Sequence, residues 1–270
     1  MIFDTHTHYD DRRFDGDRAA VLAALKTAGI GGIAAVGADL ASSKAAAGLA
    51  EQDPAFVFAP GVHPDNVLEL EEIGEEAARK ELSGLLARPK AAALGEIGLD
   101  YHGDWPDKPS RLLQEKWFRF QLRLLKEKDL PGIIHSRDAA ADTLRIIQEE
   151  GGNALSLIMH CYGYEKELAR YYLDMGHFLG IGGVVTFKNA RKLKETVMYA
   201  PLSQLLLETD CPYLAPEPYR GRRNTSLYLP KVIRAIAELK QTDPETVEAV
   251  TWENALRFFR LQDDFGKERT

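Results

Sequence analysis

The feature that most constrains the fold is a unit that repeats eight times along the chain, a short apolar run followed by an amphipathic stretch. The apolar runs lie at about 2–6, 31–37, 55–62, 91–97, 130–135, 154–160, 178–185 and 203–209. The amphipathic stretches lie near 18–29, 41–52, 69–88, 110–128, 138–150, 165–175, 189–199 and 226–240. Nearly continuous hydrophobicity is typical of parallel strands that helices cover. The alternation therefore predicts right-handed strand–helix–strand crossovers and a parallel sheet.

Eight such units predict a (β/α)₈ TIM barrel, and a doubly wound open sheet is the alternative that alternation alone does not exclude. The 270 residues fit one barrel, and no linker or low-complexity segment interrupts them, so we expect a single domain over 1–270. The Pro- and Gly-rich segment 212–223 predicts a long loop after the eighth strand. Residues 244–259 predict an extra C-terminal helix, with a charged tail after Asp263.

Charge and composition narrow the class of protein. The net charge of -7 argues against a broad grip on duplex DNA, so a nucleic-acid substrate would be held locally. No apolar run approaches the roughly 20 residues of a membrane span, and the N-terminus lacks the regions of a signal peptide. The two cysteines, Cys161 and Cys211, fit a reducing compartment. We expect a cytoplasmic protein without membrane partners, and a monomer, although no residue pattern specifies the oligomeric state.

Ionisable side chains gather where the apolar runs end. Five of the seven histidines stand there: His6, His8, His63, His135 and His160. Glu96 ends the fourth run and Asp210 the eighth. In a parallel barrel all these strand ends meet at the C-terminal rim, where catalytic groups are found.

The residue types at this rim predict a metal centre. His6 and His8 are two apart and point to the same side of a strand, although a His-x-His pair alone is more often merely hydrogen-bonded. Imidazole and carboxylate together suit Zn or Mn. Six ligands exceed the need of one catalytic ion and fit two, with Glu96 placed to bridge them. The expected ligands are His6, His8, Glu96, His135, His160 and Asp210. His102 and His177 are expected in structural or solvent-facing roles, Cys161 and Cys211 in packing, and Glu208 is left unassigned.

Longer motifs carry a family resemblance. They are FDTHTH (3–8), GVHP (61–64), GEIGLDY (95–101), HSRDA (135–139), HC (160–161), GGVVTFKNA (182–190), ETDCPYL (208–214) and RGRRN (220–224). With these motifs the chain resembles the TatD family of metal-dependent deoxyribonucleases, among the amidohydrolase-type barrels. The resemblance implies the same six residues as ligands of two metal ions, and cytosolic hydrolysis of DNA phosphodiesters, commonly supported by Mg. The metal therefore stays open among Mg, Zn and Mn.

The resulting hypothesis is a deoxyribonuclease that uses water activated at a two-metal centre and acts on single strands or ends. Asp210 and Glu96 are the expected catalytic residues, and Asp210 orients or deprotonates the water. The expected substrate contacts are His63, Arg137, Arg222 and Asn224, with neighbouring basic side chains at Lys188, Arg191, Lys192, Lys194, Arg220 and Arg223. Tyr101, Trp105, Tyr162 and Tyr164 are candidates for stacking on bases.

Two other functions fit parts of the pattern. The same scaffold acting on a non-nucleic-acid ester, amide or lactone is the first, but many such barrels carry a bridging lysine on strand four, where this chain has Glu96. A metal-binding protein without turnover is the second. A structural site is usually closed by four protein ligands, so the larger set argues against it.

Overall fold

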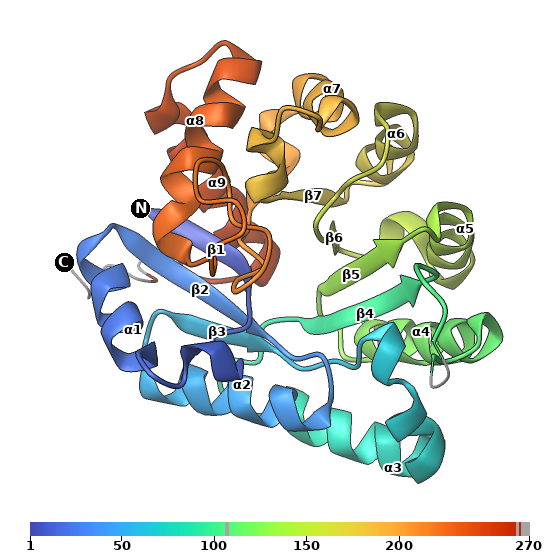
Figure 1. Ribbon diagram of the computed structural model, residues 1–270. Coiled ribbons are helices and arrows are strands. Elements are labelled where there is room, and N and C mark those ends of the chain that lie inside the picture. Colours follow the sequence, from blue (N-terminus) through green and yellow to red (C-terminus); the bar gives the residue numbers. More distant parts are fainter. Residues whose placement is uncertain (106–107, 263–264, 266–270) are drawn as a thin grey trace.

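The computed structural model describes residues 1–105, 108–262 and 265. The described strands are β1 (Ile2–Thr7), β2 (Ile30–Val36), β3 (Phe56–Ala59), β4 (Leu94–Asp100), β5 (Gly132–Arg137), β6 (Leu157–Met159), β7 (Phe178–Ile181) and β8 (Leu205–Leu207). The described α-helices are α1 (Arg18–Thr27), α2 (Leu40–Gln52), α3 (Leu68–Leu86), α4 (Arg111–Glu127), α5 (Ala140–Glu150), α6 (Lys166–Asp174), α7 (Arg191–Tyr199), α8 (Leu229–Lys240) and α9 (Pro244–Phe259). The strands form the inner wall, and α1 to α8 lie outside it (Figure 1).

The strands close into a barrel through two short seams. Regular parallel pairing joins β1, β2 and β3 into one sheet and β4 to β8 into another. Single bridges, Phe58 to Ala91 and Thr7 to Cys211, join the two sheets at both edges. Across the second seam the His8 amide donates to the Cys211 carbonyl at 2.9 Å. The (β/α)₈ prediction is confirmed, and closure at both edges excludes the open sheet.

Several strands are shorter than the apolar runs that predicted them. The run 178–185 is strand only in β7, because the 3₁₀ turn η4 (Gly183–Thr186) follows at once. A Cβ at Gly183 would overlap the Leu214 carbonyl of the loop after β8, so that loop crosses where the strand would continue. The runs 154–160 and 203–209 likewise shrink to β6 and β8. The apolar pattern marks burial, and burial continues where regular pairing stops.

Helix starts follow ordinary capping chemistry. Asp39 caps α2 in a capping box with Ser42, and Ser110 caps α4 by accepting from the Leu113 amide. Asp243 caps α9, where Pro244 occupies the first turn. The C-terminal helix is therefore confirmed. The predicted charged tail after Asp263 lies outside the described residues, apart from Phe265.

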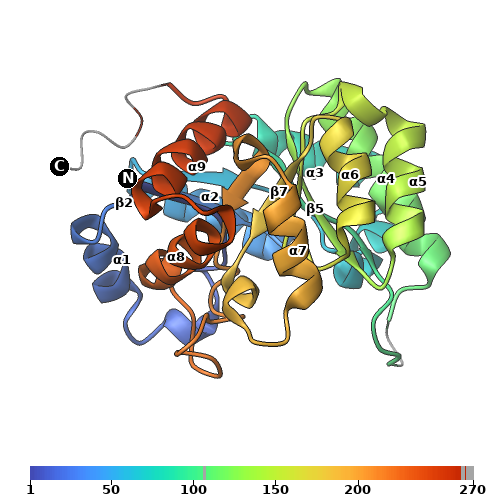
Figure 2. The same ribbon diagram turned by 90° about the horizontal axis from the view of Figure 1, so that it is seen from above.

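The core has two parts. The larger one packs the outer faces of the strands against the surrounding helices. The second joins Phe3, Val57, Ile133 and Leu206 to aromatic residues of α9, where Phe259 stacks on Phe3 with ring centroids 5.3 Å apart. Because Phe3 is near the start of β1, α9 closes the N-terminal end of the barrel, next to α8 (Figure 2). No helix among the described residues is long and apolar enough to cross a membrane.

Candidate active site

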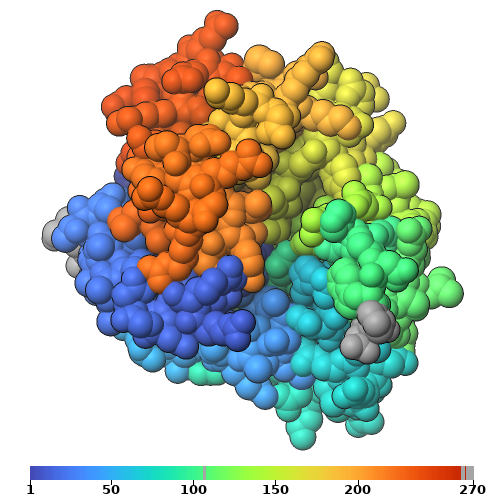
Figure 3. Space-filling view, in the orientation of Figure 1, coloured from blue at the N-terminus to red at the C-terminus, as the bar shows by residue number. Residues whose placement is uncertain are grey.

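The opposite end of the barrel is open. A cavity of about 840 Å³ lies there, and the space-filling view shows the hollow at the centre of this face (Figure 3). Its lining includes His8, His63, Glu96, His135, Arg137, His160 and Asp210. His6 is fully buried directly behind His8. The structure thus brings the strand-end residues to one place.

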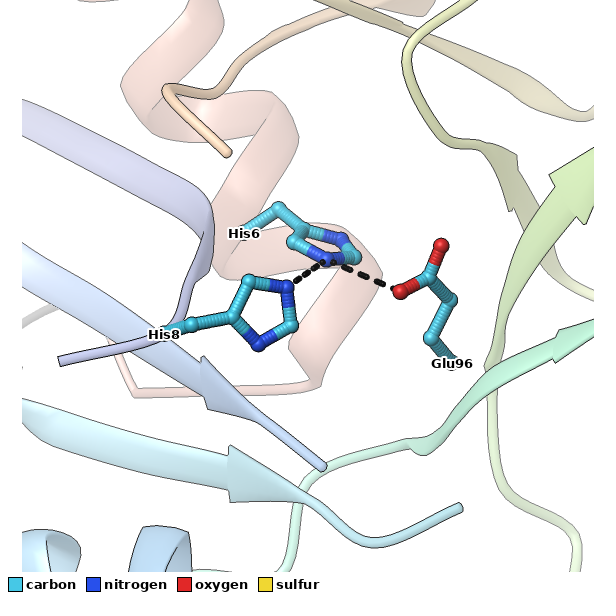
Figure 4. A group of neighbouring side chains, drawn as sticks. All are labelled: His6, His8 and Glu96. Atoms are coloured by element: carbon cyan, nitrogen blue, oxygen red, sulfur yellow. Dashed lines mark hydrogen bonds and ion pairs between the residues drawn. The ribbon is translucent and has the colours of Figure 1, made fainter. Parts of the chain in front are cut away.

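The histidine pair at the end of β1 is oriented from behind. His8 Nδ1 donates to the Val36 carbonyl of β2 at 3.0 Å, which leaves Nε2 without a proton in the neutral ring. That Nε2 lies 3.2 Å from His6 Nε2 (Figure 4). Two ring nitrogens this close together and directed at the same region could both bind one metal ion.

Glu96 stands between two groups of histidines. Its Oε2 lies 3.5 Å from His6 Nε2. Its Oε1 lies 2.7 Å from His135 Nδ1 and 3.7 Å from His160 Nε2. One carboxylate therefore presents a separate oxygen to each group, as a bridging ligand does. Figure 4 shows Glu96 reaching from β4 toward the β1 pair.

Asp210 completes the ring of acceptors. Its Oδ1 lies 3.4 Å from His8 Nε2 and 3.9 Å from both His6 Nε2 and His160 Nε2. The residue has a left-handed backbone (φ 55°), and its amide donates to the His6 carbonyl at 3.0 Å. Burial raises the pKa of Asp210, but the hydrogen bond from His8 and the nearby histidine charges outweigh it and hold the pKa below its usual value.

Two further carboxylates hold two of the predicted ligand histidines from behind. Glu208 accepts from His160 Nδ1 at 3.0 Å and from the Cys161 amide at 2.6 Å. A Cβ at Gly180 would overlap the Glu208 carboxylate, so this glycine provides its space. Asp100 accepts from His135 Nε2 at 3.0 Å. Carboxylates in this position fix the tautomer and ring direction of metal-binding histidines.

Sequence reasoning left Glu208 unassigned and missed Asp100. A usable signal existed, because Asp100 follows Glu96 by four residues and Glu208 precedes Asp210 by two. Even spacing predicts that both members of each pair lie on one side if the strand continues, although in the structure Glu208 and Asp210 lie beyond the end of β8.

The buried histidines and carboxylates of this cluster shift one another's pKa values. Burial lowers the pKa of His160, but the charges of Glu208 and Glu96 outweigh it and raise the pKa to about 10. In the same way hydrogen bonds to Asp100 and Glu96 raise the pKa of His135 to about 9. Burial raises the pKa of Glu96, but His160 and His135 hold it well below the usual value. Protons thus compensate these carboxylates where cations would do so in a metal-loaded protein.

His63 differs from the other four strand-end histidines. Its Nδ1 accepts from the Asp65 amide at 3.1 Å, so the proton of the neutral ring is on Nε2. Burial and the nearby His135 charge lower its pKa to about 3. Its donor atoms group with those of Asp100 and His135 within 4.8 Å. The tautomer nevertheless makes His63 Nε2 a hydrogen-bond donor, 4.0 Å from Glu96 Oε1, and not a metal ligand.

The predicted substrate contacts separate into two sets. Arg137 lines the cavity at the end of β5. Arg222 is exposed and Asn224 is fully buried, and neither is among the described residues that line the cavity. Asn224 instead donates to the Thr209 carbonyl at 2.8 Å and accepts from the Thr225 amide, which fixes the chain after the long loop. Arg223 pairs with Asp17 on the outside of the barrel.

The structure also locates the other basic, histidine, aromatic and cysteine residues that the sequence singled out. Arg191 pairs with Glu195 and Lys192 with Glu165, away from the cavity lining. His102 is exposed and pairs with Asp138. Tyr162, Tyr164 and Cys161 line the cavity, and Tyr162 is nevertheless buried. Tyr101 and Trp105 lie outside the cavity lining, and Cys211 is buried. Cys161 reaches the cavity because its backbone is left-handed (φ 45°) and not extended as a strand residue would be.

The donor set fits divalent ions. His6, His8 and Glu96 offer one compact group of ligand atoms, and His6 Nδ1 is a buried atom without a hydrogen-bond partner among the described residues. Imidazole nitrogen and carboxylate oxygen in such proximity are the ligands of borderline divalent metals. Carboxylate–histidine pairs behind the group are the usual support of such a site.

Comparison with known proteins agrees with this chemistry. The family model described as TatD related DNase matches residues 3–260. The Bacillus subtilis protein named uncharacterized metal-dependent hydrolase YabD is 42% identical, over 97% of this chain and 100% of the relative. The Mycobacterium tuberculosis metal-dependent hydrolase TatD is 37% identical, over 96% and 98%. The crystal structure of YJJV, a TatD homologue from Escherichia coli, has a TM-score of 0.87 and 28% identity, covering 97% and 98%. The chain is therefore a metal-dependent hydrolase that belongs to the TatD-related DNase family.

Proposed function

We propose that this chain hydrolyses phosphodiester bonds of DNA at a centre of two divalent ions, and that it acts on single strands or strand ends. The observation that carries the proposal is the placement of Glu96, whose two oxygens face different groups of histidines. His6, His8 and Asp210 with Glu96 Oε2 would hold one ion. His135 and His160 with Glu96 Oε1 would hold the other.

The protein residues have separable tasks in this reaction. Bound divalent ions supply the positive charge that makes water nucleophilic near neutral pH and polarises the phosphodiester. Asp210 is ionised, because its pKa is held low, and its Oδ1 faces three of the proposed ligand histidines. As an anion at the centre it would orient the attacking water by accepting a hydrogen bond from it. His63 donates a hydrogen bond from its Nε2–H group to a phosphate oxygen. Arg137, at the cavity wall, stabilises the charge that develops on the phosphorus oxygens.

The walls of the cavity support ends as substrates over internal sites of a duplex. Besides the proposed ligand Asp210, the described lining residues include five aspartates and one arginine, Arg137. The aspartates are Asp10, Asp11, Asp39, Asp65 and Asp138. A duplex laid across this mouth would bring many phosphates against these carboxylates, whereas a strand end brings few. A relative from Cronobacter sakazakii, 33% identical, is named 3'-5' ssDNA/RNA exonuclease TatD, which also supports this substrate class.

The test is cleavage of end-labelled single- and double-stranded DNA with Mg²⁺, Mn²⁺ or Zn²⁺, together with elemental analysis of the purified protein. Glu96→Ala and Asp210→Ala should abolish cleavage and leave the circular dichroism spectrum unchanged. Asp138→Ala is the matched control, since it removes a carboxylate from the same cavity that pairs with His102 and not with a proposed ligand. Turnover retained in both ligand variants would refute the assignment.

A further inference from the structure

An exposed aromatic ring stands at the cavity mouth, three residues after Asp210. Tyr213 is 48% exposed and lines the cavity, as does its neighbour Leu214 at 39%. The Tyr213 amide donates to the Asp210 carbonyl at 2.8 Å, which ties the ring to the backbone of the proposed catalytic residue. The ring lies edge-on to His8, with centroids 6.4 Å apart.

One face of the Tyr213 ring is already covered. The Arg13 guanidinium lies over it at 4.1 Å from the ring centroid. Asp11 holds that guanidinium with both oxygens, at 2.9 Å from Nε and 2.7 Å from Nη2. Arg13 is not among the described residues that line the cavity, whereas Tyr213 is. The clamped arginine therefore covers one face of a ring that lines the cavity, and Asp11, which holds the arginine, lines the cavity as well.

The other aromatic side chains near the mouth are engaged differently. Tyr162 is only 3% exposed, and its hydroxyl donates to the Glu165 carbonyl. The Tyr164 hydroxyl is hydrogen-bonded to Ser136 and to the Ala139 amide, which fixes it in the wall. Tyr101 and Trp105 carry Arg111 and Lys108 over their rings and do not line the cavity. Among the described lining residues, Tyr213 combines an open ring face with a rigid backing.

We propose that Tyr213 is the stacking platform for a nucleobase of the nucleotide whose phosphodiester is cleaved, and that Arg13 is a positioning residue that holds the platform in place. This inference rests on the proposed nuclease function. Stacking on tyrosine is tolerant of base identity because every base has a π-face, so the platform selects for the presence of a base and not for its sequence. The clamp by Asp11 lowers the conformational entropy that binding would otherwise cost.

The experiment is steady-state cleavage of short single-stranded DNA by the full-length, metal-loaded enzyme. Substrates are matched sets with a normal or an abasic residue at the terminal and at the penultimate position. The variants are Tyr213→Ala, Tyr213→Phe and Arg13→Ala. The matched control is Tyr199→Ala, because Tyr199 is 49% exposed on α7 and outside the cavity lining.

Tyr213→Ala should raise KM about tenfold for the base-bearing substrate, the order expected for loss of one stacked base. It should leave KM unchanged for the substrate that is abasic at the stacked position. Tyr213→Phe should behave as the wild type, Arg13→Ala should show a smaller rise, and Tyr199→Ala should show none. Equal losses on base-bearing and abasic substrates, or no loss on either, would overturn the platform. A different result would refute the proposed nuclease function itself: the wild-type enzyme binds metal and Glu96→Ala does not, but the wild type cleaves no DNA. This result is distinct from failure of the Tyr213 platform, which requires a wild type that cleaves DNA.

Discussion

Asp100 accepts a hydrogen bond from His135 Nε2 at 3.0 Å, on the edge of the imidazole opposite to Glu96, which lies 2.7 Å from Nδ1. The ring is thus held between a carboxylate inside the centre and one behind it. Burial raises the pKa of Asp100, but the hydrogen bond from His135 outweighs it and lowers the pKa to about 2. Asp100 is therefore a constant anion that fixes which nitrogen of His135 faces the centre.

Asp100→Asn should weaken metal binding while keeping the fold. Loss of a carboxylate behind a metal-binding histidine typically costs about 10- to 100-fold in metal affinity. Competition with a chromogenic chelator measures this affinity directly. Asp138→Asn provides the control from the same cavity, since its carboxylate pairs with His102. Equal affinities of Asp100→Asn and the wild type would show that His135 does not depend on this support.

Metal binding should release protons, and affinity should rise with pH. The pKa values of His135 and His160 are raised to about 9 and about 10 in the metal-free protein, so both rings hold protons well above pH 6.5. Divalent ions must displace these protons, so affinity should keep rising with pH up to about 10, as both rings lose them. Calorimetric titration in two buffers of different ionisation enthalpy counts the protons released. Metal binding to the Glu208→Gln variant should release fewer protons, because the charge of Glu208 contributes to the raised pKa of His160.

Asp4→Ala should destabilise the protein without touching a proposed ligand side chain. The fully buried Asp4 carboxylate accepts from the Thr209 amide at 2.9 Å, the Thr209 hydroxyl at 2.7 Å and the Ser226 hydroxyl at 2.6 Å. Truncation leaves buried donors unpaired, so we expect a loss of roughly 3 kcal/mol in the free energy of unfolding. Urea denaturation measures it. Glu195→Ala, which breaks an exposed pair with Arg191, should change stability by less than about 0.5 kcal/mol.

His177 should make the fold sensitive to acid. Both ring nitrogens are buried without a hydrogen-bond partner among the described residues, and burial lowers the pKa of His177 to about 4. Because the folded form resists protonation while the unfolded form accepts a proton below about 6.5, stability falls as the pH drops from 6.5 toward 4. The loss from this residue alone is roughly 3 kcal/mol. His177→Leu should lack this component in urea denaturation at pH 7.5 and 4.5. A wild type that loses no more stability than the variant over this range would contradict the assignment.

The sequence predicts the barrel and the strand-end cluster because both depend on local periodicity. Apolar runs mark strands, and in a parallel barrel every strand end meets at one rim, so His6 and Asp210 are brought together without any knowledge of their contacts. Periodicity does not predict how deeply a given side chain is buried or which group it hydrogen-bonds to. Asn224 belongs to a basic-looking loop, yet its side chain turns inward to the Thr209 carbonyl.

Other details arise from contacts between distant segments. The role of Glu208 depends on Gly180, 28 residues earlier in the chain, which leaves room for its carboxylate. Tyr213 is recognisable as a platform only once Arg13 is seen across its ring. These relationships are set by tertiary packing, which a single sequence does not display.

The barrel wall is two sheets joined by single bridges, and the proposed ligands are divided between them. His6 lies in β1 and His8 directly follows it, at the three-stranded sheet. Glu96 and His135 lie in β4 and β5, and His160 directly follows β6, at the five-stranded sheet. Ions bound between them would link the two sheets across the edges where the barrel closes. Metal binding would then stabilise the folded barrel as well as supply the chemistry, so the metal-free protein would unfold more readily than the metal-loaded one.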